Sequence, residues 1–76
     1  MSYKLTEKEK EIMFYVSEGY SNKEIAKEVY LSEATIKKHM ANIYEKYGLT
    51  NERQNGTSAL RVKAVLIYLG LKRFEK

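Results

Sequence analysis

The chain has 76 residues, no cysteine and a formal net charge of +4. A chain of this length forms one domain (1–76) with a core about three or four helices wide, which excludes a deep substrate cleft, and without cysteine it forms neither a disulfide framework nor a thiolate metal site. The polar N-terminal segment is unlike a signal peptide and the longest apolar run, 64–69, is too short to span a bilayer, so we expect a cytoplasmic protein.

An all-α fold is expected, because the chain has no proline and no segment alternates polar and apolar residues. The first predicted helix, about 6–19, begins with a capping box formed by Thr6 and Glu9 and ends at Gly19. The second, about 22–30, begins with a capping box of the same kind. The residues expected to face the core from these two helices are Leu5, Ile12, Met13, Tyr15, Val16, Ile25, Ala26 and Val29.

The third predicted helix, about 32–47, begins at Ser32 and has Gly48 as its C-terminal cap. Its apolar residues recur every three or four positions and form one narrow face: Ile36, Met40, Ile43 and Tyr47. Only Tyr30 and Leu31 separate this helix from the second one, which predicts a sharp corner. The expected fold is therefore a four-helix bundle-like domain with a central helix-turn-helix.

The outward face of the third predicted helix is suited to the major groove of duplex DNA, which admits an α-helix. Ala34 and Ala41 are small enough to let the backbone approach the groove, and Lys37 and Lys38 can reach guanine O6 and N7 or phosphates. The alternative interpretation is that both lysines are ordinary surface residues of an amphipathic helix.

The fourth predicted helix, about 58–70, carries an apolar run, Ala64 to Leu69, although a domain this small cannot cover a helix on all sides. One side is therefore expected to contact another chain, and a modestly exposed apolar patch is the alternative. We assign the contact to the stripe formed by Val62, Leu66 and Leu69. The adjoining face expected to pack on the first three helices is Ala64, Val65 and Tyr68.

Positive charge is concentrated in the second half of the chain. Residues 1–36 contain five lysines and seven glutamates, whereas residues 37–76 contain nine basic and three acidic residues. Randomly mixed surface charges would not separate in this way, so the difference favours a polyanionic partner. Nucleic acid is the first candidate, and an anionic membrane surface is the competing one.

Ordered short motifs extend over residues 5–49. They are LTEKEKE at 5–11, GYSNKEIA at 19–26, TIKKH at 35–39 and IYEKYG at 43–48. In this order the motifs resemble the LuxR/GerE-type helix-turn-helix domain of bacterial transcription regulators. Chance does not account for several ordered blocks over this much of the chain.

The resemblance implies that the third helix is the recognition helix and assigns DNA contacts position by position. The positions that correspond to base-facing residues are Lys37, Lys38 and Ala41. Those that correspond to phosphate-facing residues are Lys23, Thr35 and Lys46. Relatives often carry a polar or basic residue at the place of Ala41, which can offer only a methyl contact to thymine, so a short base readout per half-site is expected.

The resemblance also assigns dimerisation to the fourth helix and so favours a symmetric homodimer over an exposed patch. Two recognition helices would then contact two half-sites in successive turns of the major groove. The expected partners are double-stranded DNA, a second copy of the chain and RNA polymerase. No cofactor, membrane contact or small-molecule ligand is expected.

The last segment departs from the family pattern. Relatives carry an arginine shortly after the third helix, where this chain has Glu52 followed by Arg53. A better match begins at Arg61, which implies an inserted segment and predicts an exposed loop over about 50–59. A DNA contact made by Arg53 from this loop is the less favoured alternative.

Catalysis and metal binding are not expected. His39 has no carboxylate four residues before or after it, and no nucleophile, base and orienting group converge, so we assign no catalytic or metal-binding residue and give His39 a structural role. We expect a stand-alone DNA-binding regulator, because no phosphoacceptor or ligand-binding domain precedes Tyr3. The rival interpretations are the promoter-binding tail of a sigma factor, and a helical protein-interaction module or antagonist that pairs with a related regulator through the fourth helix.

Overall fold

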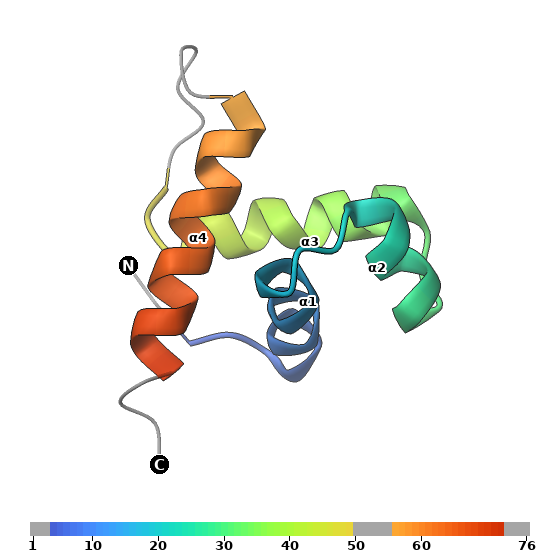
Figure 1. The fold of residues 1–76 in the computed structure, drawn as a ribbon, viewed down its shortest axis with the longest axis horizontal. Coiled ribbons are helices and arrows are strands. Elements are labelled where there is room, and N and C mark those ends of the chain that lie inside the picture. Colours follow the sequence, from blue (N-terminus) through green and yellow to red (C-terminus); the bar gives the residue numbers. More distant parts are fainter. Residues whose placement is uncertain (1–3, 50–55, 73–76) are drawn as a thin grey trace.

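Four α-helices and no strand make up residues 4–49 and 56–72, the part of the chain that the computed structural model describes. The helices are α1 (Glu7–Ser17), α2 (Asn22–Val29), α3 (Glu33–Lys46) and α4 (Gly56–Lys72). In Figure 1, α3 runs across the molecule, α1 and α2 pack along one side of it, and α4 crosses its C-terminal half. The predicted all-α fold with a central helix-turn-helix is confirmed. None of the helices in the described ranges is both long and apolar enough to cross a membrane.

The helix starts follow from local side-chain capping. Thr6 Oγ1 accepts a hydrogen bond from Glu9 N at 3.1 Å, and Glu9 Oε1 accepts one from Thr6 N at 2.8 Å, so both predicted partners satisfy a backbone N–H at the start of α1. Ser21 and Glu24 form the same reciprocal pair at the start of α2, with distances of 3.1 and 2.9 Å. At α3 the cap is one-sided, because Ser32 Oγ accepts from the backbone N of Thr35 at 3.1 Å.

The core lies where the apolar faces of the four helices meet. Its fully buried large side chains are Ile12, Met13, Ile25, Ile36 and Ile43. Tyr15, which the helical periodicity placed in the core, is only half-buried, and its ring packs against Phe14 and Tyr20 with centroid distances of 5.3 and 5.0 Å. A phenol at the margin of the core keeps its hydroxyl close to water, which explains this position.

The fourth helix begins earlier than predicted. Its start at Gly56 lies two residues before the predicted start at about 58, so the end of the loop expected over about 50–59 is helical. Leu60 and Ala64, one turn apart, are 2% and 0% exposed and anchor the first half of α4 to the other helices. Tertiary packing therefore overrides the low apolar content of residues 56–59. The rest of the predicted loop, including Arg53, lies outside the described residues.

The corner between α2 and α3 contains a strained residue. Tyr30 has φ 59° and ψ 42°, which is the left-handed conformation that glycine or asparagine usually occupies at the end of a helix. Its side chain is 92% exposed and therefore gains little from packing. Leu31 follows with its N–H donated to Ala26 O at 3.0 Å, which closes the turn.

The left-handed backbone at Tyr30 predicts that Tyr30→Gly stabilises the protein. Glycine removes the Cβ clash of this conformation, which outweighs its greater entropy in the unfolded chain, so the free energy of unfolding should rise by about 0.5–1 kcal/mol. Urea denaturation followed by circular dichroism measures the change. Tyr30→Ala is the matched control, because it removes the ring and keeps the strain, and it should leave stability nearly unchanged. Equal effects of the two substitutions would show that the ring, and not the backbone, is responsible.

Candidate nucleic-acid interface

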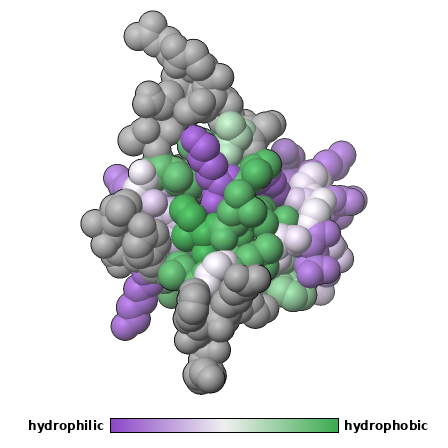
Figure 2. Space-filling model, turned by 60° about the vertical axis from the view of Figure 1, so that its left-hand side comes forward, coloured by the Kyte–Doolittle hydropathy of each residue, from purple (hydrophilic) through white to green (hydrophobic). Residues whose placement is uncertain are grey.

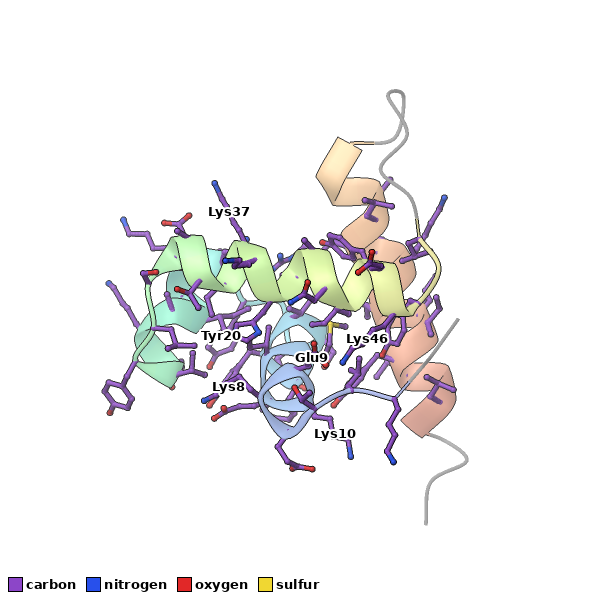
Figure 3. The ribbon with its side chains drawn as sticks, turned by 180° about the vertical axis from the view of Figure 1, so that it is seen from behind. Lys8, Glu9, Lys10, Tyr20, Lys37 and Lys46 are labelled. Atoms are coloured by element: carbon purple, nitrogen blue, oxygen red, sulfur yellow. The ribbon has the colours of Figure 1, made fainter. Side chains whose placement is uncertain are left out.

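One face of α3 is exposed along the length of the helix while the opposite face is buried. Ile36, Met40 and Ile43 are 0–3% exposed and hold the helix against the core. The exposed positions on the outer face include Ala34, Lys37, Lys38 and Ala41. Figure 3 shows Lys37 projecting from α3 on the side opposite α1. The three predicted base-facing residues are thus brought together on one outward surface, to which Ala41 contributes only a methyl group.

Two of the three predicted phosphate-facing residues lie in the first turn of a helix. Lys23 is exposed in the first turn of α2. Thr35 is half-buried in the first turn of α3, and its Oγ1 lies 2.8 Å from Ser32 Oγ. The Thr35 hydroxyl is therefore already oriented by the cap of α3.

Lys46, the third predicted phosphate-facing residue, is engaged inside the domain. Its Nζ lies 2.6 Å from Glu9 Oε1, and the two side chains are 29% and 5% exposed. Figure 3 shows the pair between α1 and α3. Sequence reasoning recognised Glu9 only as a capping residue, because its partner is 37 positions away and no local pattern links the two. Glu9 can pair with Lys46 only once α1 has packed on α3.

The Glu9 carboxylate remains charged although it is buried. Burial by itself raises its pKa, but the hydrogen bond from Lys46, the hydrogen bonds from Thr6 and the positive charge of Lys46 together hold the pKa below its ordinary value. One carboxylate thus caps α1 and ties α1 to the C-terminal turn of α3. The ion pair fixes the orientation of α3 at the end remote from its N-cap.

The apolar stripe predicted on α4 is exposed. Val62, Leu66 and Leu69 are 60%, 65% and 45% exposed. The adjoining face behaves as predicted, since Ala64 is buried and Val65 and Tyr68 pack against the core as half-buried residues. Figure 2 shows apolar side chains gathered on the side of the molecule that carries α4. This leaves a hydrophobic surface on the helix next to the helix-turn-helix.

His39 is half-buried on α3, between the core and the outer face. Within residues 4–49 and 56–72, no group of three or more His, Asp or Glu side chains is placed to hold a metal ion. The predicted structural role of His39 stays a prediction.

Comparisons with known proteins match most of the chain. The family described as bacterial regulatory proteins, luxR family, matches residues 3–59. The chain is 36% identical over 59 residues to the uncharacterised transcriptional regulatory protein YhcZ of Bacillus subtilis, covering 78% of this chain and 28% of the relative. It is 37% identical over 57 residues to the transcriptional regulatory protein LnrK of the same organism, covering 75% and 26%. Against the HTH-type transcriptional regulator MalT of Yersinia pestis it is 32% identical over 65 residues, covering 86% and 7%. The chain therefore spans less than a third of the length of these relatives.

The ion pair predicts a pH-dependent loss of stability in Glu9→Gln. Glutamine keeps the cap and loses the charge, so at pH 7 the free energy of unfolding should fall by about 1–3 kcal/mol. Because the pKa of folded Glu9 is lowered, its contribution is present above the ordinary value of 4.5 and is lost as the pH falls through the lower value. The difference in the free energy of unfolding between wild type and variant, measured by urea denaturation, should therefore disappear as the pH falls from 5 to strongly acidic values.

The matched control for this prediction is Glu7→Gln. Glu7 Oε2 lies 3.7 Å from Lys10 Nζ with both side chains exposed, so the substitution should cost less than about 0.5 kcal/mol at any pH. If the free energy of unfolding lost in Glu9→Gln is the same at neutral and acidic pH, the charged carboxylate is not the source of the stabilisation.

Proposed function

Because the chain belongs to the LuxR family of bacterial regulatory proteins, we propose that it is a sequence-specific transcription regulator that binds double-stranded DNA as a homodimer, with α3 in the major groove. The observation that carries this proposal is the outer face of α3, which presents Lys37 and Lys38 beside the small Ala41 while the opposite face is held in the core. Such a regulator acts on bacterial DNA in the cytoplasm. RNA polymerase is a further proposed partner.

The dimensions of α3 suit this role. Its 14 residues make a rod about 21 Å long, and the major groove admits a helix of this kind. Lys37 and Lys38 then lie within reach of guanine O6 and N7, and the Ala41 methyl group can contact a thymine methyl. Because Ala41 offers no hydrogen bond, the proposed readout per half-site rests on the two lysines.

The proposed phosphate contacts rest on Lys23 and Thr35. Lys23 lies in the first turn of α2 and Thr35 in the first turn of α3, and phosphate contacts from these positions would fix the domain on the duplex without reading sequence. Lys46 is a weaker candidate, because its ammonium group is already paired with the buried Glu9 carboxylate. A substitution of Lys46 would therefore change folding stability as well as DNA affinity.

The proposed dimer uses the exposed stripe of α4. A two-fold axis through Val62, Leu66 and Leu69 would bury the same surface on both copies and cover the largest apolar residues that α4 leaves exposed. The two α3 helices would then address half-sites about 34–36 Å apart.

A second candidate function is favoured by the same stripe. An antagonist that pairs with a related regulator through α4 would also need this exposed apolar surface. The two functions differ in DNA binding by the protein alone. A regulator gives a gel shift with genomic fragments that resists competitor DNA and weakens steeply with salt, whereas an antagonist gives none and forms a tighter complex with the relative.

Replacing Lys37 or Lys38 with alanine tests the recognition face. Each change should weaken binding to a duplex selected from a random pool by about 1–3 kcal/mol and relax the preference at one base. Lys23→Ala should weaken all duplexes about equally and reduce the salt dependence. Lys10→Ala is the control, since Figure 3 shows Lys10 projecting from α1 on the side away from Lys37. Unchanged affinity and preference in both Lys37→Ala and Lys38→Ala would rule out α3 as the recognition helix.

Leu66→Asp tests the dimer. Burying a leucine contributes about 1.5–3 kcal/mol, and in a symmetric dimer the substitution is present in both copies. The variant should therefore be a folded monomer with weak nonspecific DNA binding. Light scattering reports the mass and circular dichroism reports the fold. Tyr30→Asp, which replaces a side chain that is even more exposed and lies outside the stripe, should stay dimeric. A dimeric Leu66→Asp protein would exclude this stripe, and an unfolded one would place Leu66 in the monomer core.

A further inference from the structure

The guanidinium group of Arg61 joins α4 to the start of α2. Arg61 Nη1 donates a hydrogen bond to Asn22 Oδ1 at 2.7 Å, and Arg61 Nη2 donates one to Tyr20 O at 2.6 Å. Asn22 is the first residue of α2, and Tyr20 lies in the turn between α1 and α2. Two nitrogens of one planar group are thus fixed on two acceptors 39 and 41 positions away in the chain.

The same group also lies beside α3. Burial raises the pKa of the Tyr44 phenol, and the positive charge of Arg61 and a hydrogen bond from it offset part of this increase. Arg61 therefore contacts the segment between α1 and α2, the first turn of α2 and the C-terminal half of α3 from a single position on α4.

Arg61 acts here through geometry more than through ion pairing. The ion pairs found among the described residues do not include it, and its hydrogen bonds to Asn22 and Tyr20 are accepted by a neutral amide and a backbone carbonyl. A planar fork that meets two acceptors restricts the direction of approach as well as the distance. Lysine carries the same charge but cannot reproduce this arrangement.

The two ends of this connection lie beside the two surfaces on which the proposed function depends. Arg61 directly precedes Val62, the first residue of the exposed α4 stripe, and Asn22 directly precedes Lys23. Apolar side chains also hold α4 on the domain: Leu60 and Ala64 are buried, and Val65, Ile67, Tyr68 and Leu71 pack against the core as half-buried residues. Apolar burial is not directional, so it opposes a small change in the angle of α4 less than the two directed hydrogen bonds of Arg61 do.

We propose that Arg61 is a positioning residue that sets the angle of α4 against the helix-turn-helix and thereby the half-site spacing that the dimer accepts. The angle of α4 matters for DNA binding, because each base pair added between the half-sites moves them apart and also rotates one relative to the other. A dimer with a fixed angle accepts one spacing, and a dimer that pivots accepts several. The inference rests on the proposed function and adds the element that determines its spacing.

The test compares wild type with Arg61→Lys, which cannot make the paired hydrogen bonds, and with Asn22→Ala, which removes one of the two acceptors. A random duplex pool first returns the wild-type half-site and spacing, and affinities are then measured for duplexes with one base pair added or removed and for a single half-site. Wild type should lose about tenfold in affinity for each altered spacing, which is about 1.4 kcal/mol. Both variants should lose much less than this and should bind the single half-site as wild type does.

Two controls separate positioning from other roles of Arg61. Lys63→Arg replaces a lysine with an arginine at an exposed position of α4 near Arg61. Its affinity should depend on the half-site spacing as that of wild type does. The double variant Arg61→Lys with Asn22→Ala should be no more tolerant of spacing than Arg61→Lys alone, because both changes remove the same hydrogen bond. Circular dichroism and light scattering establish that each variant is folded and dimeric at the concentrations used.

The possible failures are distinct. If the wild type selects no duplex, the proposed function fails and the inference fails with it. If the wild type selects a sharp spacing that Arg61→Lys and Asn22→Ala retain, the proposed function stands and Arg61 does not set the spacing. Equal weakening at every spacing and at the single half-site would make Arg61 a DNA contact, and monomeric or unfolded variants would make it a residue of the dimer or the core. Each of these last two results also overturns the inference.

Discussion

The burial of one face of α3 is the constraint on which the rest of the structure depends. Ile36, Met40 and Ile43 take the helix into the core at successive turns, and the remaining helices lie where they can cover those side chains. A domain of 76 residues has little apolar surface to spare, so it can hold only one side of this helix. The other side is exposed as a direct result, and the proposed DNA contact uses a surface that the packing itself leaves open.

Apolar packing holds the helices together, but two polar connections determine how they are oriented. Glu9 and Lys46 tie the start of α1 to the end of α3, and Arg61 ties α4 to the start of α2. Both connections begin at groups that are at least partly buried, where a hydrogen bond competes less with water. Packing of helix ridges into grooves leaves about 15–20° of scatter in a crossing angle, so directed contacts of this kind can refine the relative placement of the proposed DNA-facing and dimer-facing surfaces.

The exposed stripe of α4 and the strained Tyr30 show where the domain departs from its own stability optimum. Val62 and Leu66 leave apolar area in water, and Tyr30 keeps an unfavourable backbone conformation without packing in return. The stripe has an explanation in the proposed dimer, because a surface that is costly in the monomer becomes the buried centre of an interface. Nothing in the structure explains why tyrosine occupies the corner.

The sequence by itself determined the four helices, the starts of the first three, and which face of α3 is buried and which is exposed. Thr6 with Glu9, Ser21 with Glu24 and Ser32 act on backbone groups within one turn, and the apolar spacing in α3 repeats at the period of the helix, so neighbours in the chain carry enough information. The motifs from 5 to 49 likewise indicated the family before any distance was known.

Only the tertiary structure decided the pairing of Lys46 with Glu9, the fork of Arg61 and the early start of α4. The first two join residues 37 and 39 positions apart, and no local pattern distinguishes such a lysine or arginine from a solvent-exposed one. Residues 56–59 have little helical signal of their own, and they begin a helix whose next turns are held by the buried side chains of Leu60 and Ala64. Capping and periodicity act over one or two turns, whereas the partner of a long polar side chain depends on which helices packing has brought within a few ångströms of it.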